Sequence, residues 1–171
     1  VSDAQLTDSQ SFILVVNPVN DAPVLSSIAA QNVDEDNTFT YQLSADDVDG
    51  DDLTYVASSS HGSVSIAGST LTLVPDQDYN GDIQINVTVD DGQLTDSQSF
   101  ILIVNPVNDT PELDIISDQS LDEDNTFTYQ LSASDVDGDF LEYTASVNAN
   151  ASVSVDESTL SIIPYADYNG D

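Results

Sequence analysis

The sequence contains no lysine and no arginine, and His61 is its only histidine. It does contain 32 aspartate and glutamate residues, so its formal net charge at neutral pH is −32. Side-chain salt bridges cannot neutralise these carboxylates, and their mutual repulsion opposes a compact state. The positive charge must therefore come from metal ions, dissolved salt or a basic partner. We expect no nucleic-acid partner, because its phosphates would be repelled.

Cysteine is also absent, which excludes a disulfide framework and thiolate metal sites. No apolar run is long enough to span a bilayer, and no signal peptide is visible. The first residue is Val1 rather than methionine, so we interpret the chain as an internal piece of a longer protein. The 39% of hydrophobic residues is enough to build packed cores, which distinguishes the chain from a disordered acidic tail.

The sequence repeats itself at an offset of 88 or 89 residues. The clearest matches are residues 5–14 with 93–102, 34–45 with 122–133, and 75–82 with 164–171. The larger offset of the last match indicates one inserted residue, in the 147–151 region. We therefore predict three parts: the C-terminal strand and linker of a preceding repeat (1–21), a complete repeat (22–109), and an incomplete repeat lacking its last strands (110–171).

Alternating polar and apolar residues predict strands and no helix. In the complete repeat the predicted strands are about 27–33, 38–45, 53–58, 63–67, 70–74, 83–89 and 97–104. Turn residues such as Asp-Gly and Asn-Gly separate them. Seven short strands in about 88 residues predict an all-β fold of tandem Greek-key β-sandwiches of immunoglobulin-like type, joined by short linkers.

The direction of successive strands sorts the acidic loops into two groups at opposite ends of a repeat. The residues predicted at the lower end and in the outgoing linker are Glu35, Asp76, Asp78, Asn105, Asn108 and Asp109. The residues predicted at the upper end and in the incoming linker are Asn17, Asn20, Asp21, Asp47, Asp49 and Asp91. When repeats are stacked, the lower group of one meets the upper group of the next.

Carboxylate, amide and backbone oxygens are the ligands that calcium prefers, in sets of roughly 6–8. Zinc would need histidine or cysteine, and magnesium would need a stricter geometry. A single 47-DVDGD-51 loop is readily interpreted as an ordinary acidic turn. Four acidic loops and an Asn/Asp linker converging on one junction favour Ca²⁺ between repeats instead.

These motifs, in this order, resemble the cadherin-like repeats of large bacterial surface and secreted proteins. The resemblance implies calcium ligation by Glu35, by Asp76 and Asp78 around Gln77, and by an Asp of the Asp91 type. It extends the set to Glu123, Asp135 and Asp137 in the following repeat. The linker departs from the family pattern at Pro106 and lacks its final Asn, and 165-YAD-167 keeps only Asp167.

The resemblance implies an extracellular, calcium-rigidified rod, stalk or filament segment that contacts neighbouring repeats or like subunits. Two alternatives remain open: a calcium-dependent module that binds polysaccharide or a cell-surface ligand, and a filament subunit that donates residues 1–16 to a neighbour's incomplete repeat. For the out-of-phase ends themselves, we favour a boundary within a longer array over strand donation. We expect no enzyme, because the carboxylate pairs recur with the repeat and no nucleophile–base constellation is present.

Overall fold

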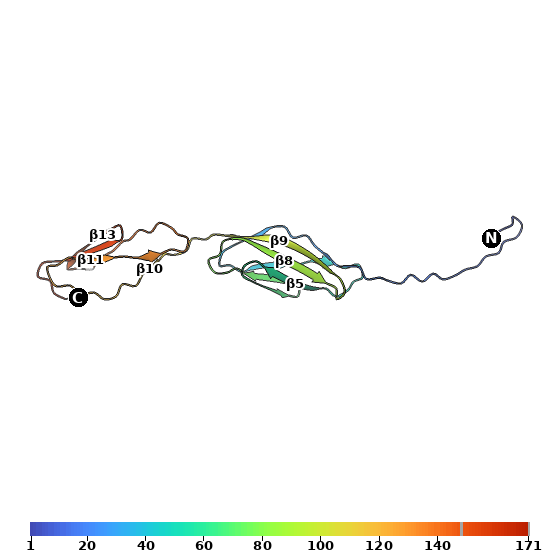
Figure 1. Cartoon of the computed structure of the whole chain (residues 1–171), viewed down its shortest axis with the longest axis horizontal. Helices are drawn as coiled ribbons and strands as arrows, with labels where there is room; N and C mark the ends of the chain where they lie inside the picture. The colour runs from blue at the N-terminus through green and yellow to red at the C-terminus, as the bar shows by residue number, and fades with distance from the viewer. Residues whose placement is uncertain (148, 171) are drawn as a thin grey trace. The chain divides into compact units, whose positions relative to one another are not determined.

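The computed structural model describes residues 1–147 and 149–170, in two compact units, Val1–Asn105 and Pro106–Asp171. Within these described residues all regular structure is β-strand, which confirms the predicted all-β class (Figure 1). Asn148, in the region predicted to hold the insertion, lies outside the described residues, as does Asp171 at the end of the repeated 164–171 segment. None of the described residues forms a helix that could cross a membrane.

The first unit is a sandwich of two main sheets and a short strand pair. Its strands are β1 (Val24–Leu25), β2 (Gln31–Asp34), β3 (Phe39–Gln42), β4 (Ala45–Asp46), β5 (Thr54–Ser59), β6 (Ser63–Ala67), β7 (Thr70–Val74), β8 (Gly81–Asp90) and β9 (Thr95–Asn105). One sheet has the order β2-β9-β8-β5, and the other has the order β3-β7-β6. The pairing of β2 with β9 is parallel, and the other pairings in these sheets are antiparallel.

The prediction of one continuous strand at about 27–33 is wrong. The chain instead forms β1, which pairs with β4, and then β2, which pairs with β9 in the other main sheet. Ser26 still donates its backbone N–H to Ser44 O at 2.9 Å, so the first pairing ends there. The segment between β1 and β2 therefore carries the chain from one side of the sandwich to the other. A pattern of alternating polar and apolar side chains cannot predict such a crossing.

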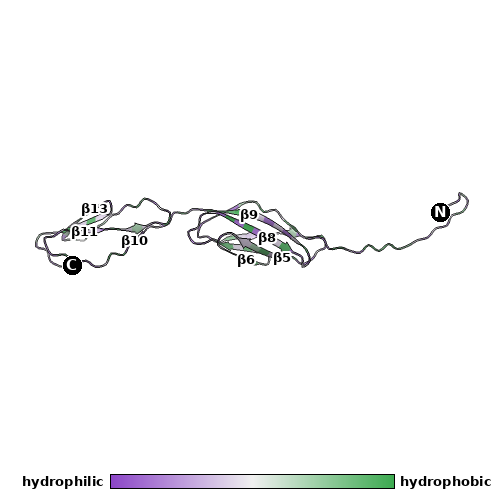
Figure 2. Cartoon of the chain, in the orientation of Figure 1, coloured by the Kyte–Doolittle hydropathy of each residue, from purple (hydrophilic) through white to green (hydrophobic). Residues whose placement is uncertain are grey.

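The core lies between the two sheets and follows the alternation of the sequence. In β8, the four side chains Ile83, Ile85, Val87 and Val89 are 0% exposed, while the residues between them face outward. Figure 2 shows green and purple stretches along β8 and β9. Full burial of one such side chain stabilises the fold by roughly 1.5–3 kcal/mol. This core fixes the strand ends, and the strand ends carry the acidic loops.

The second unit contains β10 (Glu112–Leu113), β11 (Phe127–Gln130), β12 (Ala133–Ser134), β13 (Ala151–Asp156) and β14 (Thr159–Pro164). The order β11-β14-β13 repeats that of β3-β7-β6, and β10 pairs with β12 as β1 pairs with β4. The counterparts of β2 and β5 are not strands among the described residues. In the first unit those two strands pair with β9 and β8, and the described residues of the second unit contain no equivalent partners.

Candidate metal centres

The loop after β4 is wrapped around one carboxylate. Asp47 Oδ1 accepts the backbone N–H groups of Asp49 and Gly50 at 2.9 Å and of Asp51 at 3.2 Å. Gly50 has φ +80°, a left-handed conformation that glycine adopts without strain. The turn therefore holds the Asp47 carboxylate in one orientation. Its second oxygen, Oδ2, is buried and has no hydrogen-bond partner among the described residues.

Two linker residues join this loop to the loop between β8 and β9. Asn20 Nδ2 donates to Asp91 Oδ2 at 2.9 Å, and the Asp21 N–H donates to Asp49 Oδ2 at 2.8 Å. Asp91 Oδ1 also accepts backbone N–H groups of its own loop, including that of Leu94 at 2.7 Å. The linker and both acidic loops thus meet at one end of the first unit.

The charges at this end are unequally stabilised. The backbone N–H of Leu94, then the Asn20 amide and the N–H of Gln93, hold the pKa of Asp91 below its usual value of 3.8. Loss of water contact, followed by repulsion from Asp47, Asp49 and Asp91, raises the pKa of Asp51 above the same value. The structure thus supplies hydrogen-bond donors for Asp91 and no positive side chain for Asp51. A cation at this end would stabilise the ionised form of Asp51.

The opposite end of the first unit contains a buried carboxylate. Glu35 is 2% exposed, its backbone N–H donates to Asn105 O at 2.9 Å, and its Oε2 accepts Asn80 Nδ2 at 3.4 Å. Asn105 Nδ2 in turn donates to Asp34 Oδ1 at 3.1 Å. The start of the outgoing linker is therefore tied to the residues around Glu35.

The loop between β7 and β8 reaches the same end. Asp36 Oδ1 accepts the N–H of Asp78 at 3.1 Å, so the two acidic loops are in direct contact. Asp76 Oδ2 accepts the N–H of Gly62 at 3.0 Å, which ties this loop to the β5–β6 turn. The carboxylates of Asp76 and Asp36 are thus partly used in shaping the loops.

The second unit repeats the upper-end geometry. The Asp109 N–H donates to Asp137 Oδ2 at 2.7 Å, as that of Asp21 does to Asp49. Asp135, Asp137 and Asp139 each have a carboxylate oxygen within 4.8 Å of the others. Such an oxygen cluster could hold a metal ion. Asn108, next in the linker, donates its side-chain amide to Asp109 O at 2.8 Å.

Two predicted ligands lie apart from these groups. Asn17 is in the exposed segment before the first sandwich, and within the described residues no hydrogen bond joins its side chain to the other predicted ligands. Glu123 is exposed although its surrounding sequence, 122–133, is identical to that around Glu35. The Glu35 N–H bonds to the end of β9, and the described residues of the second unit have no counterpart of β9.

Sequence reasoning missed some members of these clusters. Asp51 and Asp139 end the two DVDGD loops, and Asp36 follows Glu35 in 34-DED-36. Each belongs to a repeated acidic motif, so the repeat itself was a sufficient signal. Asn80 belongs to 78-DYNGD-82, a segment whose sequence predicts a turn. Nothing local to Asn80 indicates that its amide reaches Glu35, 45 positions away in sequence.

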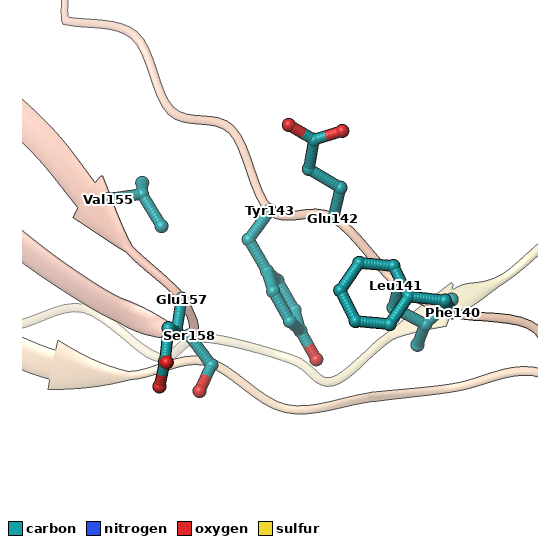
Figure 3. Close-up of a pocket in the computed structure, with 7 residues that line it drawn as sticks. All are labelled: Phe140, Leu141, Glu142, Tyr143, Val155, Glu157 and Ser158. Carbon is teal, nitrogen blue, oxygen red and sulfur yellow. The ribbon is translucent and has the colours of Figure 1, made fainter.

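A cavity of about 530 Å³ in the second unit lies outside these acidic clusters. It is lined by Phe140, Leu141, Glu142, Tyr143, Val155, Glu157 and Ser158 (Figure 3). Leu141 and Tyr143 are the repeat counterparts of Leu53 and Tyr55, which pack against the core of the first unit. We therefore interpret this cavity as sandwich interior left open along the stretch that corresponds to β5, and assign it no ligand.

The family model described as bacterial Ig domain matches residues 20–103. Residues 20–103 are a bacterial Ig domain. The match begins at Asn20, in the linker that bonds to the acidic loops, and includes all nine strands of the first unit except the last residues of β9.

Solved cadherin ectodomains share the fold of this Ig domain and of the unit that follows it. Domains EC1-2 of human protocadherin-24 align with a TM-score of 0.54 at 18% identity, covering 86% of this chain and 79% of theirs. Domains EC1-4 of Drosophila N-cadherin align with a TM-score of 0.52 at 18% identity, covering 88% of this chain and 43% of theirs. At these identities the likeness is one of fold.

Among curated proteins, the chain is similar to chitinase A of Pseudoalteromonas piscicida, at 30% identity over 139 residues. The aligned part is 76% of this chain, and the chain spans only 16% of the length of that chitinase. The similarity therefore concerns a minor part of that protein.

Proposed function

We propose that this chain is a segment of an extracellular bacterial protein in which calcium binds at the ends of Ig domains and stiffens the array. The bound ions would neutralise carboxylates that no basic side chain can reach. The segment would then act as a spacer or adhesive stalk that carries other domains of a larger protein. In this proposal the domain limits are those of the repeat: 1–21, 22–109 and 110–171.

The observation that carries the proposal is the state of Asp47. One of its oxygens holds the loop together by three backbone hydrogen bonds, while the other is buried without a donor. Burying an anionic oxygen without a hydrogen-bond partner costs free energy. A cation bound beside Asp47 Oδ2 would offset that cost. Linker residues also hydrogen-bond to Asp49 and Asp91 at the same end of the unit.

The donor set favours calcium over other metals. All candidate ligand atoms are carboxylate, amide or backbone oxygens, which hard cations prefer, and irregular clusters suit calcium better than magnesium. The proposed ligands are Asn17, Asn20, Asp21, Glu35, Asp47, Asp49, Asp76, Asp78, Asp91, Asn105, Asn108, Asp109, Glu123, Asp135 and Asp137. We expect dissociation constants of roughly 10⁻⁴–10⁻³ M, typical of extracellular modules.

Calorimetric titration of the chain with calcium tests the proposal. The double variant Asp47→Asn/Asp49→Asn should lose a class of sites that the wild type has. Asp8→Asn is the matched control, because Asp8 is exposed and its only described hydrogen bonds are through its backbone. Small-angle scattering in chelator and in millimolar calcium should show a narrower length distribution with calcium. Equal calcium uptake by the double variant and the wild type would contradict the proposal.

Polysaccharide binding is a second candidate, favoured by the similarity to a chitinase. In this alternative the Ig domain would hold a larger enzyme, or the parent protein, on an insoluble polysaccharide. Pull-down on chitin and cellulose, with calcium and with chelator, distinguishes the two functions. A chain that binds calcium but neither polymer is a spacer. We infer no catalysis by this chain, since its acidic clusters recur with the repeat.

Strand donation between copies is a third candidate. Residues 1–16 are exposed, and Phe12 and Ile13, whose repeat copies lie in β9, are 87% and 90% exposed. In this alternative the segment would pair with the second unit of another copy. Sedimentation of the chain at high concentration tests it, and a monomer throughout the concentration range would remove it.

A further inference from the structure

The tripeptide Asn-Gly-Asp occurs in both repeats, at 80–82 and 169–171. Asn80 lies directly before β8, at the end of the loop that carries Asp76 and Asp78. It is not among the predicted metal ligands, and its side-chain amide bonds to the buried Glu35. We propose that the Asn80–Gly81 peptide is a self-modifying site, at which loss of ammonia converts the amide partner of Glu35 into a carboxylate.

The chemistry needs only water as a co-reactant. The backbone nitrogen of Gly81 forms a bond to Cγ of Asn80, the Cγ–Nδ2 bond breaks, and ammonia leaves with the proton from the Gly81 N–H. Water then opens the cyclic imide at either carbonyl carbon. One product is aspartate, and the other is isoaspartate, whose backbone runs through the former side chain. Both products carry a carboxylate in place of the neutral amide: at the end of the side chain in aspartate, and attached directly to Cα in isoaspartate.

The local structure favours this step at Asn80 over the same step at Asn86. Gly81 has no side chain to shield its nitrogen, and it adopts φ +132°, where residues with a Cβ are strained. Asn80 is exposed to water, and its one described side-chain hydrogen bond, to Glu35 Oε2, is long at 3.4 Å. By contrast, Asn86 in the middle of β8 is exposed but is followed by Val87, whose branched side chain is packed in the core.

The modification would reverse the electrostatics around Glu35. Glu35 is 2% exposed and now accepts a hydrogen bond from an uncharged amide. A carboxylate in that place would face another carboxylate with no basic side chain in the whole chain to separate them. Without a bound cation, the modified chain would be less stable than the unmodified chain. A bound cation would also stabilise the modified chain by more than it stabilises the unmodified one. This last consequence rests on the proposed calcium function, whereas the modification itself does not.

The first experiment follows the modification directly. The whole chain is incubated in chelator at mildly alkaline pH, ammonia release is measured, and peptide mapping by mass spectrometry locates the acid products. We expect Asn80 to convert at least about tenfold faster than Asn86, a difference of ~1.4 kcal/mol in barrier. The variant Asn80→Ser should abolish conversion at this position. Equal rates at Asn80 and Asn86, or conversion of Asn80 only in the urea-unfolded chain, would overturn the proposal.

The second experiment isolates the effect of the new charge. Asn80→Asp imitates the aspartate product, and Asn80→Ser removes the amide without adding charge. In chelator, Asn80→Asp should unfold at a lower temperature than Asn80→Ser, and calcium should remove the difference. If both variants unfold alike in chelator, the charge argument around Glu35 is wrong. If the wild type binds no calcium while Asn80 still releases ammonia, the proposed function fails and the modification stands.

Discussion

Calcium should raise the unfolding temperature of the Ig domain, and the size of the effect can be worked out in advance. A ligand that binds only the folded state stabilises it by RT ln(1 + [L]/Kd). For one site with a dissociation constant of roughly 10⁻⁴–10⁻³ M, about 10 mM free calcium gives about 1.4–2.7 kcal/mol. A domain of 60–100 residues gains roughly 4–8 °C per kcal/mol. The expected rise is therefore about 6–20 °C for each site that belongs to the domain.

Differential scanning calorimetry of the chain in chelator and in calcium measures this rise. Sodium chloride at matched ionic strength is the first control, because dissolved salt also screens carboxylate repulsion. Magnesium is the second control, since it tests whether the site accepts any divalent cation. The variant Asp47→Asn/Asp49→Asn should lose most of the calcium effect, while Asp8→Asn should keep it.

The stability of the double variant in chelator is a further test of the carboxylate repulsion. Removing two of the crowded carboxylates also removes repulsion, so in chelator the variant should be at least as stable as the wild type. A variant that is less stable in chelator would mean that the hydrogen bonds accepted by Asp47 Oδ1 outweigh that repulsion. A calcium effect no larger than that of sodium chloride would refute site binding altogether.

Three further predictions concern the fold. Leu102→Ala should lower the unfolding free energy by about 2–5 kcal/mol, because the Leu102 side chain is 0% exposed. Leu14, its repeat copy, is 76% exposed, so Leu14→Ala should leave the unfolding free energy almost unchanged. Thermal melts compare the two variants. Gly62→Ala should lower the unfolding temperature more than Gly68→Ala, because both glycines have positive φ but a Cβ at Gly62 would clash with the backbone of β7. Asp51→Asn should raise the unfolding temperature in chelator at neutral pH. The raised pKa of Asp51 means that its charged form opposes folding, so this gain should vanish on acidification below the usual pKa of 3.8, where both states bind the proton.

The sequence was sufficient to predict the alternation of the core and the grouping of the loops. Each strand reverses the direction of the chain, so loops separated by an even number of strands fall at one end whatever the details of packing. That is why Asp49 and Asp91 could be placed together before any contact was known. The partners of Glu35 and the crossing of the first strand between sheets could not be predicted, because both depend on contacts between residues far apart in sequence.

The duplicated decapeptide separates local from non-local causes of structure. Residues 5–14 and 93–102 are identical, yet the second forms most of β9 while the first is exposed. The turn before each copy nevertheless has the same geometry: Asp3 Oδ1 accepts the N–H groups of Gln5 and Leu6, as Asp91 Oδ1 accepts those of Gln93 and Leu94.

A single β-bridge, Ser2 to Thr7, repeats the pairing of Asp90 with Thr95. An acidic turn of this kind is therefore specified by its own side-chain hydrogen bonds, whereas the strand beside it needs a partner strand and a core. It follows that the loops that present carboxylates can keep their shape while the strands between them vary. An array of repeats can thus retain the acidic loops that we propose to bind calcium as its core sequences diverge. Circular dichroism of Leu102→Ala with calcium titration tests this separation: the variant should lose stability but bind calcium at the upper end with nearly unchanged affinity while it remains folded.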